Sequence, residues 1–479
     1  MDFIKSIFIY VLLSSIVMSF AFSCSDDEFT TSPNSLLVFS SDTINMDTLF
    51  TTIGSSTRRL MVYNRHSKAI NISTIKLINA GNSGFVINVD GMSGDVFDNV
   101  EIAREDSMFI FVEAKLRETA QDEPVRMEDL ISFEFNGVKQ QVVLEAYAQD
   151  AYMWKGKVIE SDTTLTSQKP ILIYDSLYVA LGATLKMEAG TRLFLHDATA
   201  IKVDGKIISE GVLDNPVVIR GDRTDNLFPN LPYSEMPGQW GGIHIRSNSY
   251  GNSFNYTDIK GMDWGIKIDS ADVDQLKLKL TNCILRYSNK ALIDATNANV
   301  VAGNCEFALS GGSQVFVKGG RHSYTQCTFA NYFPYGFSNE PSVVLTNQEI
   351  DLETAVTKDY DLLQADFNNC IIWGNKGTEV ELRYVEGGGE FAHRFDHCLI
   401  KARGENDDNF IDIQWDVDPD FAEVDDDDYK FDFRIDSLSG AIGKGSPEFI
   451  KEYPFDLLGN PRLAIEVDLG AYQWVGERP

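Results

Sequence analysis

The chain has 479 residues, with 43% hydrophobic and 11% aromatic residues, so it is long enough for two or three domains with a sizeable core. This composition excludes a disordered protein. The formal net charge is −30 at pH 7. A surface this acidic repels a phosphate backbone, so we do not expect nucleic acid as a partner.

The first 23 residues predict a signal peptide. Lys5 precedes an apolar run over residues 7–22, which is too short and too closely followed by acidic residues for a spanning helix. The run ends in Ala21-Phe22-Ser23-Cys24, which resembles a bacterial lipobox and implies that mature Cys24 carries lipid. The alternative is an ordinary signal peptide followed by a chance cysteine.

Acidic residues follow this cysteine directly. Asp26, Asp27 and Glu28 resemble the export signal of surface lipoproteins in the Bacteroidota. The resemblance implies a protein anchored to the outer membrane by its N-terminal lipid and exposed on the cell surface. We expect residues 24–35 to form a tether.

Residues 36–150 predict an immunoglobulin-like β-sandwich. Short strand-like runs, such as residues 60–63, 85–89 and 108–112, alternate with polar turns, and no long apolar stripe at helical spacing interrupts them. The segment contains no catalytic constellation, so we expect it to act as a spacer.

Residues 151–404 contain a repeated phrase in which a polar residue precedes a cysteine and then apolar residues. The first three cysteines recur with a step of 22 residues, and the next gap is nearly two such steps. A fixed period with one strand per copy predicts a parallel β-helix. The cysteines are Cys283, Cys305, Cys327, Cys370 and Cys398.

Two segments exceed the coil length, at residues 222–237 and 340–363. Long insertions on a rigid solenoid are common places for binding functions. We therefore expect any ligand site to lie close to one of them.

The five cysteines of the repeat are predicted to be buried thiols stacked in the core. In-register neighbours in a parallel sheet lie about 4.8 Å apart, whereas a disulfide needs Cβ atoms at about 3.8 Å with converging vectors. The alternative is that these cysteines bind zinc, but the chain has no Cys-x-x-Cys pair. We expect no metal and no cofactor. Glu306 follows Cys305 and should point away from the core, so Glu306→Ala is expected to be nearly neutral.

Several short sequence segments together resemble those of the right-handed parallel β-helix lipoproteins of Bacteroides-type bacteria, which have the pectin-lyase-like fold. They lie at residues 237–243, 256–259, 369–375, 418–421, 456–462 and 468–472. The resemblance implies that residues 405–479 form a C-terminal capping segment. It carries no catalytic assignment.

The function expected from these features is a non-enzymatic binding or adhesion module, directed toward polysaccharide or host glycan. Surface aromatic rings could stack on sugars, although Trp240, beside two glycines, could equally pack where an insertion rejoins the coil. The candidate rings are Trp240, Trp264, Trp373, Trp415, Tyr233 and Tyr250.

The alternative function is a polysaccharide lyase or glycoside hydrolase, because the pectin-lyase-like fold hosts both. Such hydrolases use Gly-His-Gly and Arg-Ile-Lys, and neither tripeptide occurs. Such lyases need clustered carboxylates for calcium and a basic residue. The best candidate group is Asp258, Lys260, Asp263, Lys267, Asp269, Arg246 and Arg286. Charged residues are the normal outward face of a solenoid, so we assign no catalytic residue.

The acidic run Asp425 to Asp428 offers a second place for calcium. It lacks the glycine and the closing glutamate of an EF-hand loop. Solvated charge near the end of the rod is the simpler interpretation.

Overall fold

The computed structural model describes residues 28–228, 230–338, 340–350 and 356–476. They are almost entirely β-structure and divide into two compact units, one ending at Asp150 and the other beginning at Ala151. The predicted fold class, an all-β chain with a sandwich followed by a parallel β-helix, is confirmed. No helix within the described ranges has the length and hydropathy that a membrane span requires.

The first unit is a sandwich of two five-stranded sheets. One sheet has the order β1 (Val38–Phe39), β3 (Arg58–Tyr63), β8 (Ser107–Ala114), β5 (Phe85–Val89) and β6 (Met92–Gly94). The other has the order β2 (Thr43–Phe50), β10 (Val138–Gln149), β9 (Val125–Phe135), β4 (Ile70–Leu77) and β7 (Val96–Ile102).

Alternating side chains build this sandwich. Along β8, Met108, Ile110 and Val112 are buried between the sheets, whereas Phe109 and Phe111 point outward. Such alternation is the pattern of a strand with one face in the core. All strand pairs are antiparallel except β2 with β10, which is parallel.

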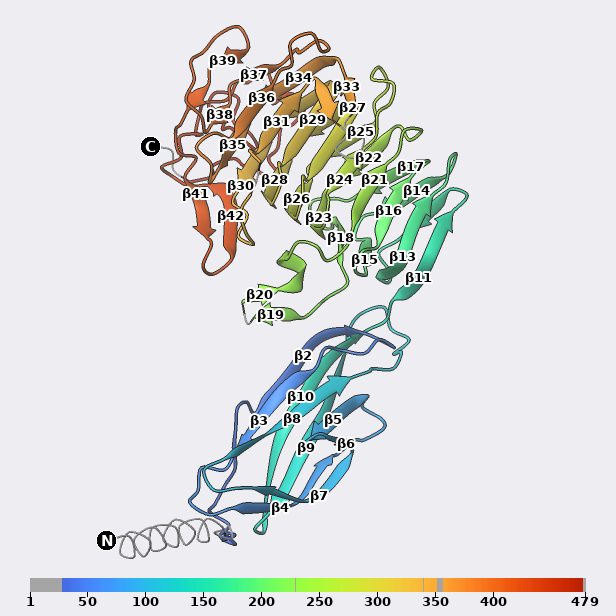
Figure 1. Ribbon diagram of the computed structural model, residues 1–479, viewed down its shortest axis with the longest axis vertical. Coiled ribbons are helices and arrows are strands. Elements are labelled where there is room, and N and C mark those ends of the chain that lie inside the picture. Colours follow the sequence, from blue (N-terminus) through green and yellow to red (C-terminus); the bar gives the residue numbers. More distant parts are fainter. Residues whose placement is uncertain (1–27, 229, 339, 351–355, 477–479) are drawn as a thin grey trace, which may run out of the picture. The chain divides into compact units, whose positions relative to one another are not determined.

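The second unit is a parallel β-helix with three faces, and its strands stack in chain order from β11 to β39 in Figure 1. Its first two coils contain β11 (Tyr152–Ile159), β12 (Thr163–Leu165) and β13 (Ile171–Val179). The first face continues with β15 (Arg192–Leu195), β18 (Val217–Gly221), β23 (Thr257–Met262), β26 (Ile284–Ser288), β28 (Glu306–Ser310), β30 (Thr328–Asn331), β35 (Ile371–Gly374), β38 (Leu399–Ile400) and β40 (Gln414–Trp415).

The other two faces share the long strands β27 (Ile293–Gly303) and β29 (Val315–Thr325), which bend from one face to the next. The second face also contains β16 (Ala200–Val203), β21 (Gly242–Ile245), β24 (Ile266–Ile268), β31 (Val343–Thr346) and β36 (Val380–Arg383). The third face also contains β14 (Thr184–Glu188), β17 (Lys206–Glu210), β22 (Asn252–Asn255), β25 (Leu278–Thr281), β34 (Leu362–Asn368), β37 (Arg394–Asp396) and β39 (Phe410–Ile411).

The unit also contains three short hairpins, two inserted between coil strands and one in the C-terminal segment. The strands are β19 (Asn226–Phe228) with β20 (Leu231–Pro232), β32 (Gln348–Ile350) with β33 (Thr357–Asp359), and β41 (Phe421–Asp425) with β42 (Lys430–Ile435). A single turn of 3-10 helix, η1 (Tyr233–Glu235), follows β20. The first two hairpins lie in the two insertions that the sequence predicts.

The polar residue before each repeated cysteine marks a sharp bend. Asn282, Asn304, Gln326, Asn369 and His397 all have left-handed backbone conformations, with φ between 49° and 54° for four of them and 55° for Gln326. Asparagine tolerates this region better than most residues, because its short polar side chain can satisfy nearby backbone groups. In each of these five coils the bend turns the chain from the third face to the first.

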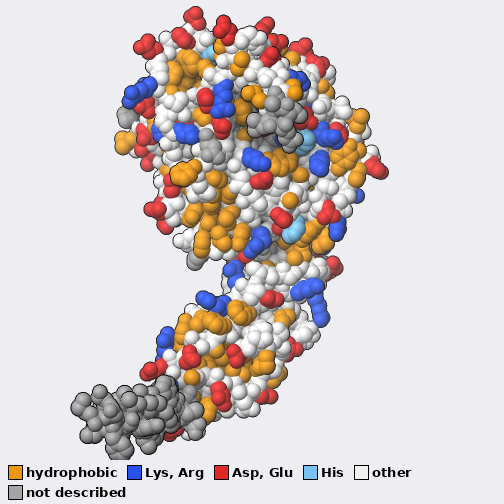
Figure 2. Space-filling model, viewed as in Figure 1, with side chains coloured by type: hydrophobic (Ala, Val, Ile, Leu, Met, Phe, Trp, Pro, Cys, Tyr) orange, Lys and Arg blue, Asp and Glu red, His pale blue; other side chains and the backbone are white. Residues whose placement is uncertain are grey.

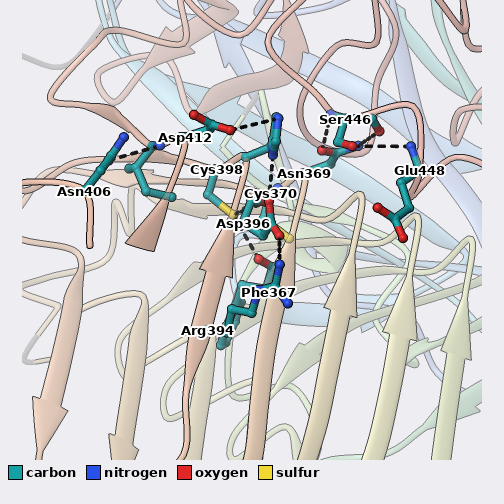
Figure 3. A network of polar contacts seen from close by, with 12 residues as sticks. Phe367, Asn369, Cys370, Arg394, Asp396, Cys398, Asn406, Asp412, Ser446 and Glu448 are labelled. Atoms are coloured by element: carbon teal, nitrogen blue, oxygen red, sulfur yellow. Dashed lines mark hydrogen bonds and ion pairs between the residues drawn. The ribbon is translucent and has the colours of Figure 1, made fainter. Parts of the chain in front are cut away.

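The asparagines at this bend are also hydrogen-bonded between coils. The amide of Asn304 donates to Asn282 at 2.7 Å, and the amide of Asn282 donates to Asn255 at 3.0 Å. Asn369 instead faces Ser446, to whose carbonyl it donates at 2.9 Å and from whose backbone N–H it accepts at 2.8 Å (Figure 3). The bend therefore holds the coils together and also binds a distant part of the chain.

All five cysteines of the repeat lie in the core as fully buried free thiols. Each can donate a weak hydrogen bond to the carbonyl two residues earlier, as Cys283 does to Thr281 and Cys305 to Gly303, both at 3.2 Å. Burial raises the pKa of Cys305 and Cys370 well above the usual value for a thiol. They therefore behave as small hydrophobic side chains.

The C-terminal segment lies along the outer side of the first face. Phe433, Leu457 and Tyr472 pack with Ala308 and Ala330, two small outward-facing residues of β28 and β30. Further along the stack, the residues buried together are Ile371, Trp373, Leu399, Ile435, Ala441 and Leu469. Strands from β26 to β38 are thus covered on this side.

Buried charged groups fix that segment in place. Asp456 accepts three backbone N–H bonds, and Asp468 accepts two, so both carboxylates are satisfied without solvent. Arg462 donates to the Asn304 side chain at 2.6 Å and to the Gly470 carbonyl at 3.1 Å. The tail segments at residues 456–462 and 468–472 therefore encode turns and anchoring contacts.

Candidate functional site

The second face carries a row of polar and aromatic side chains on its outer surface. Cross-strand register aligns His244 with Lys267, Lys267 with Asp294, and Asp294 with Phe316. Their neighbours in sequence, such as Ile243 and Val317, point into the core. Because side chains alternate along a strand, the outer position of each strand falls in one continuous row.

A recess of about 410 Å³ opens where this row meets the second insertion. Strands β29, β31 and β36 form its floor, and β32 forms a wall. Its lining residues are Phe316, Lys318, Thr346, Gln348, Glu349, Ile350, Arg383 and Val385. The recess thus lies beside the second insertion.

Lys318 lies at the centre of one charge network in the recess. Its ammonium is 2.8 Å from Asp294 and 2.9 Å from Glu349, which links the helix face to the hairpin. Burial alone would lower the pKa of Lys318, but the two carboxylates outweigh that effect and raise it above its ordinary value. The Lys318 side chain is therefore a cation held between two carboxylates.

Arg383 forms the second network. Its guanidinium is 2.9 Å from Glu381 and also pairs with Glu340. The hydrogen bond to Glu381 is the main reason that the pKa of Arg383 is raised. Each cation of the recess thus has two carboxylate partners, and no cation among these lining residues is free of negative charge.

Phe316 lies between these two cations. The Lys318 ammonium is 5.2 Å and the Arg383 guanidinium carbon 5.7 Å from the ring centroid, within the range of cation–π attraction. The ring is partly exposed and held in position by charged neighbours. An aromatic ring surrounded by oriented charged groups can contact an apolar ligand face and hydrogen-bond the ligand's edge.

Phe316, Lys318 and Arg383 are not among the candidate residues that the sequence indicates. Nothing in their local sequence differs from an ordinary outward strand position. The sequence did contain one indication of the site, because all three residues lie on strands that flank the insertion at residues 340–363. Their proximity depends on the register of the coils.

The group proposed for a lyase does not assemble. Asp258 and Lys260 pair with each other at 3.2 Å on the first face, whereas Asp269 pairs with His244 at 2.8 Å beside the second. The remaining members are also divided: Lys267 lies on β24, Asp263 is 3.8 Å from Lys290, and Arg246 is 2.8 Å from Asp204. The candidates therefore form separate ion pairs.

Arg286, the last member of that group, lies beneath the C-terminal segment. It makes a two-pronged ion pair with Glu306, with one contact at 2.9 Å, and Glu306 is fully buried. The expectation that Glu306→Ala would be nearly neutral assumed that Glu306 is exposed, and that assumption is wrong. The glutamate does point away from the core, but the segment that contains Tyr472 covers that side.

Two of the six candidate stacking rings are buried, and the other four are partly exposed. Trp240 lies in the core, and its indole N–H donates to the Lys260 carbonyl at 2.9 Å. Trp373 is buried against the C-terminal segment, and Trp415 packs against the last coil. Trp264 is partly exposed, with its ring edge-on to His244. The packing interpretation of Trp240 thus holds.

The two tyrosines proposed with them also have neighbours. Tyr233 lies 3.8 Å from the guanidinium carbon of Arg223, and Tyr250 lies 5.0 Å from the ammonium of Lys277. Neither borders the recess on the second face.

The acidic run at residues 425–428 forms the turn between β41 and β42. Asp425 accepts backbone N–H bonds from Asp427 and Asp428, and Asp428 pairs with Lys430 at 2.9 Å. Across the described part of the chain, no cluster of three or more His, Cys, Asp or Glu side chains has an arrangement that could hold a metal ion.

The predicted anchor lies mostly outside the described residues, which begin at Glu28. Cys24, Asp26 and Asp27 are not among them. Glu28 is exposed, and its carboxylate is 2.7 Å from the Lys68 ammonium.

No family model matches this sequence, and no curated protein does. The solved structures that overlap it weakly include the following three. The Vibrio cholerae VesB protease is 10% identical, with 25% of this chain and 33% of that chain covered and a TM-score of 0.18. A family 123 glycoside hydrolase from Clostridium perfringens is 10% identical, with coverage of 24% and 26% and a TM-score of 0.17.

The third is a protein of unknown function from Porphyromonas gingivalis W83, 12% identical, with coverage of 27% and 57% and a TM-score of 0.16. This chain thus spans less than two thirds of each of these three structures. At such TM-scores the overlaps are local and support no assignment of fold or function.

Proposed function

We propose that this protein is a lipid-anchored cell-surface protein that binds an uncharged glycan in the recess on the second face of its β-helix. The observation behind the proposal is the partly exposed Phe316 ring, held between Lys318 and Arg383 and surrounded by carboxylates. The lipobox-like Cys24 and the acidic residues after it support the location.

The chemistry of a sugar ring fits this arrangement. One face of a pyranose presents C–H groups with partial positive charge, which suit the negative face of an aromatic ring. Hydroxyl groups around its edge can donate to Glu349 or Glu381 and accept from Lys318 or Arg383. A recess of about 410 Å³ lies within the usual range for small-ligand sites.

The charge of the recess favours an uncharged ligand. Its two cations are already paired with four carboxylates, namely Asp294 and Glu349 around Lys318, and Glu340 and Glu381 around Arg383. A uronate or a sulfated sugar would have to displace one of these carboxylates and would meet a chain of net charge −30. Neutral hydroxyl groups meet no such barrier.

The lyase or hydrolase alternative has no specific observation in its favour. Its candidate residues are divided among separate pairs, and one of them, Arg286, lies under the C-terminal segment. We therefore propose binding rather than bond cleavage.

The experiment is electrophoresis of the mature protein through gels that contain one polysaccharide each. The panel holds uncharged polymers (an α-glucan, a β-glucan, a mannan and a xylan) and two uronates, pectin and alginate. The proposal predicts retardation by at least one uncharged polymer and none by the uronates. Retardation by the uronates alone, or by nothing in the panel, would overturn it.

A further inference from the structure

The first unit carries an exposed aromatic pair on the outer face of the sheet that contains β8. Phe109 and Phe111 are 47% and 40% exposed, and their ring centroids lie 6.1 Å apart with planes inclined by 21°. The Arg59 guanidinium carbon lies 5.6 Å from the Phe109 ring centroid, so the two rings and this cation form one exposed patch. Figure 2 shows hydrophobic side chains at the surface of this unit among acidic, basic and other polar ones.

A recess of about 320 Å³ lies next to Phe111. Its walls mix apolar and polar groups from β8, β5 and β6, and its lining residues are Thr57, Val86, Ile87, Asn88, Ser93, Phe111 and Glu113. The recess therefore combines an exposed ring, an exposed aliphatic side chain at Val86 and hydroxyl, amide and carboxylate groups.

The polar groups of this recess are only partly used within the protein. Thr57 donates to one Glu113 oxygen at 2.6 Å, and the Asn88 amide nitrogen donates to Ser93 at 3.2 Å. The Asn88 carbonyl oxygen has no hydrogen-bond partner among the described residues, although it is shielded from solvent. An unpaired acceptor at such a site marks a place where a donor would be stabilising.

We propose that the sandwich is a second saccharide-binding module, with Phe109 and Phe111 as the stacking surface and the recess beside Phe111 as the place for sugar hydroxyls. Glu113 is the one charged residue in the lining of the recess and disfavours anionic groups there, whereas the exposed Arg59 guanidinium lies beside the stacking surface, 5.6 Å from the Phe109 ring centroid. The proposal goes beyond the β-helix recess and replaces the spacer role expected for this unit.

Glycan suits the surface better than the other occupants. A stable protein interface needs roughly 1,000 Å² of buried area or more, whereas two rings beside a small polar recess offer one compact contact. Insertion into lipid would bury the Glu113 carboxylate with no cation paired to it and the Asn88 carbonyl oxygen with no donor, which is unfavourable. Two sites on one chain would also strengthen binding to a polymer relative to a short sugar, through effective concentration.

The test uses the full-length mature protein with Phe109→Thr and Phe111→Thr combined, because threonine keeps a high strand propensity. Val96→Ser, an exposed apolar residue of β7 in the other sheet, is the matched control. A second variant pair, Phe109→Val and Phe111→Val, removes the rings but keeps an apolar surface. Unfolding midpoints of all variants verify that the sandwich stays folded.

The proteins are tested against a panel of uncharged polysaccharides. We expect at least one polymer to bind the parent and the Val96→Ser control with equal affinity. The same polymer should bind both double variants at least tenfold more weakly than it binds the parent. The proposal is overturned if both double variants bind every polymer as the parent does, or if no polymer binds the parent. It is also overturned if ring removal instead abolishes binding to phosphatidylethanolamine vesicles or dissociates a dimer of this chain. Phe316→Ala, measured in parallel, reports on the β-helix recess alone, so failure at one site is distinguishable from failure at the other.

Discussion

The hydroxyl of Tyr472 donates a hydrogen bond of 2.5 Å to the carboxylate of Glu306, a residue 166 positions earlier in the chain. Both residues are buried, and Glu306 also holds Arg286 through two contacts. Burial and the neighbouring carboxylate raise the pKa of Tyr472 well above its ordinary value. One carboxylate thus attaches the C-terminal segment to the first face of the β-helix.

Glu306→Ala should therefore lower the free energy of unfolding by about 3 kcal/mol, because it removes a fully buried carboxylate that pairs with the partly buried Arg286 cation and accepts from Tyr472. Denaturation in urea at pH 7 measures this change. Glu423→Ala, at an exposed position of β41, serves as the control and should change stability by less than about 0.5 kcal/mol. Similar values for the two variants would show that the C-terminal segment does not cover Glu306 in solution.

Cys305→Ala should be milder, at about 1 to 2 kcal/mol, because it removes a small apolar volume that neighbours can partly fill. Cys305→Asp would place an unpaired carboxylate in the core and should cost several kcal/mol or abolish folding. The same denaturation series ranks both against the parent. A neutral Cys305→Asp would mean that this position is not in the core.

The buried thiols should react with a thiol reagent only after denaturation, because Cys283, Cys305, Cys327, Cys370 and Cys398 are all fully enclosed. Reducing agent should leave the melting temperature unchanged. Counting reactive thiols before and after addition of guanidinium tests this, and a large drop in melting temperature on reduction would reveal a disulfide.

His322 should make stability depend on pH. Burial lowers the pKa of this imidazole from 6.5 to about 4, so between these values the unfolded chain binds a proton that the folded chain does not. The stabilising contribution is complete above pH 6.5 and is lost as the pH falls toward 4; between pH 7 and pH 5 the loss is about 2 kcal/mol.

His322→Gln isolates that effect, because glutamine can still donate to the Gly319 carbonyl that His322 contacts at 3.0 Å. Unfolding free energies of parent and variant at pH 7 and pH 5 give the comparison. The variant should lose about 2 kcal/mol less than the parent over this range. Equal losses would place His322 in contact with solvent.

Cys24→Ala should release the protein from the membrane fraction, since Cys24 alone occupies the lipobox-like position. Retention of the variant on membranes after a high-salt wash would contradict the lipoprotein proposal. Alanine at Asp26, Asp27 and Glu28 should keep the protein on the periplasmic side, as measured by protection from external protease.

The coil register could be predicted from sequence because it is encoded locally: a residue that tolerates the left-handed region, a cysteine, then a strand. The C-terminal segment that covers the first face could not be predicted in this way. Glu306 occupies an outward strand position, which is usually exposed, and its partner Tyr472 is far away in sequence. The small residues Ala308 and Ala330 at outward positions were the available signal. They leave room for the segment that packs on them.

The sequence predicts the approximate location of the recess on the second face but not the residues that line it. The excess length of residues 340–363 indicates an insertion, but it does not say that Phe316 and Arg383 meet beside it. Residues 316 and 383 become neighbours across the intervening strand β31, through pairings of β29 with β31 and β31 with β36. Contacts between coils depend on such strand pairings. A single sequence predicts these pairings only where the coil length of about 22 residues is not interrupted by an insertion.

The most direct test of the proposed function is the dissociation constant of an uncharged oligosaccharide for the parent and for Phe316→Ala, measured by calorimetry with a fragment of the polymer that retards the parent. Phe337→Ala, at a position 93% exposed and outside the recess, is the control. We predict that Phe316→Ala weakens binding at least tenfold while Phe337→Ala leaves it unchanged. Equal affinity of the parent and Phe316→Ala would contradict glycan binding in the recess on the second face.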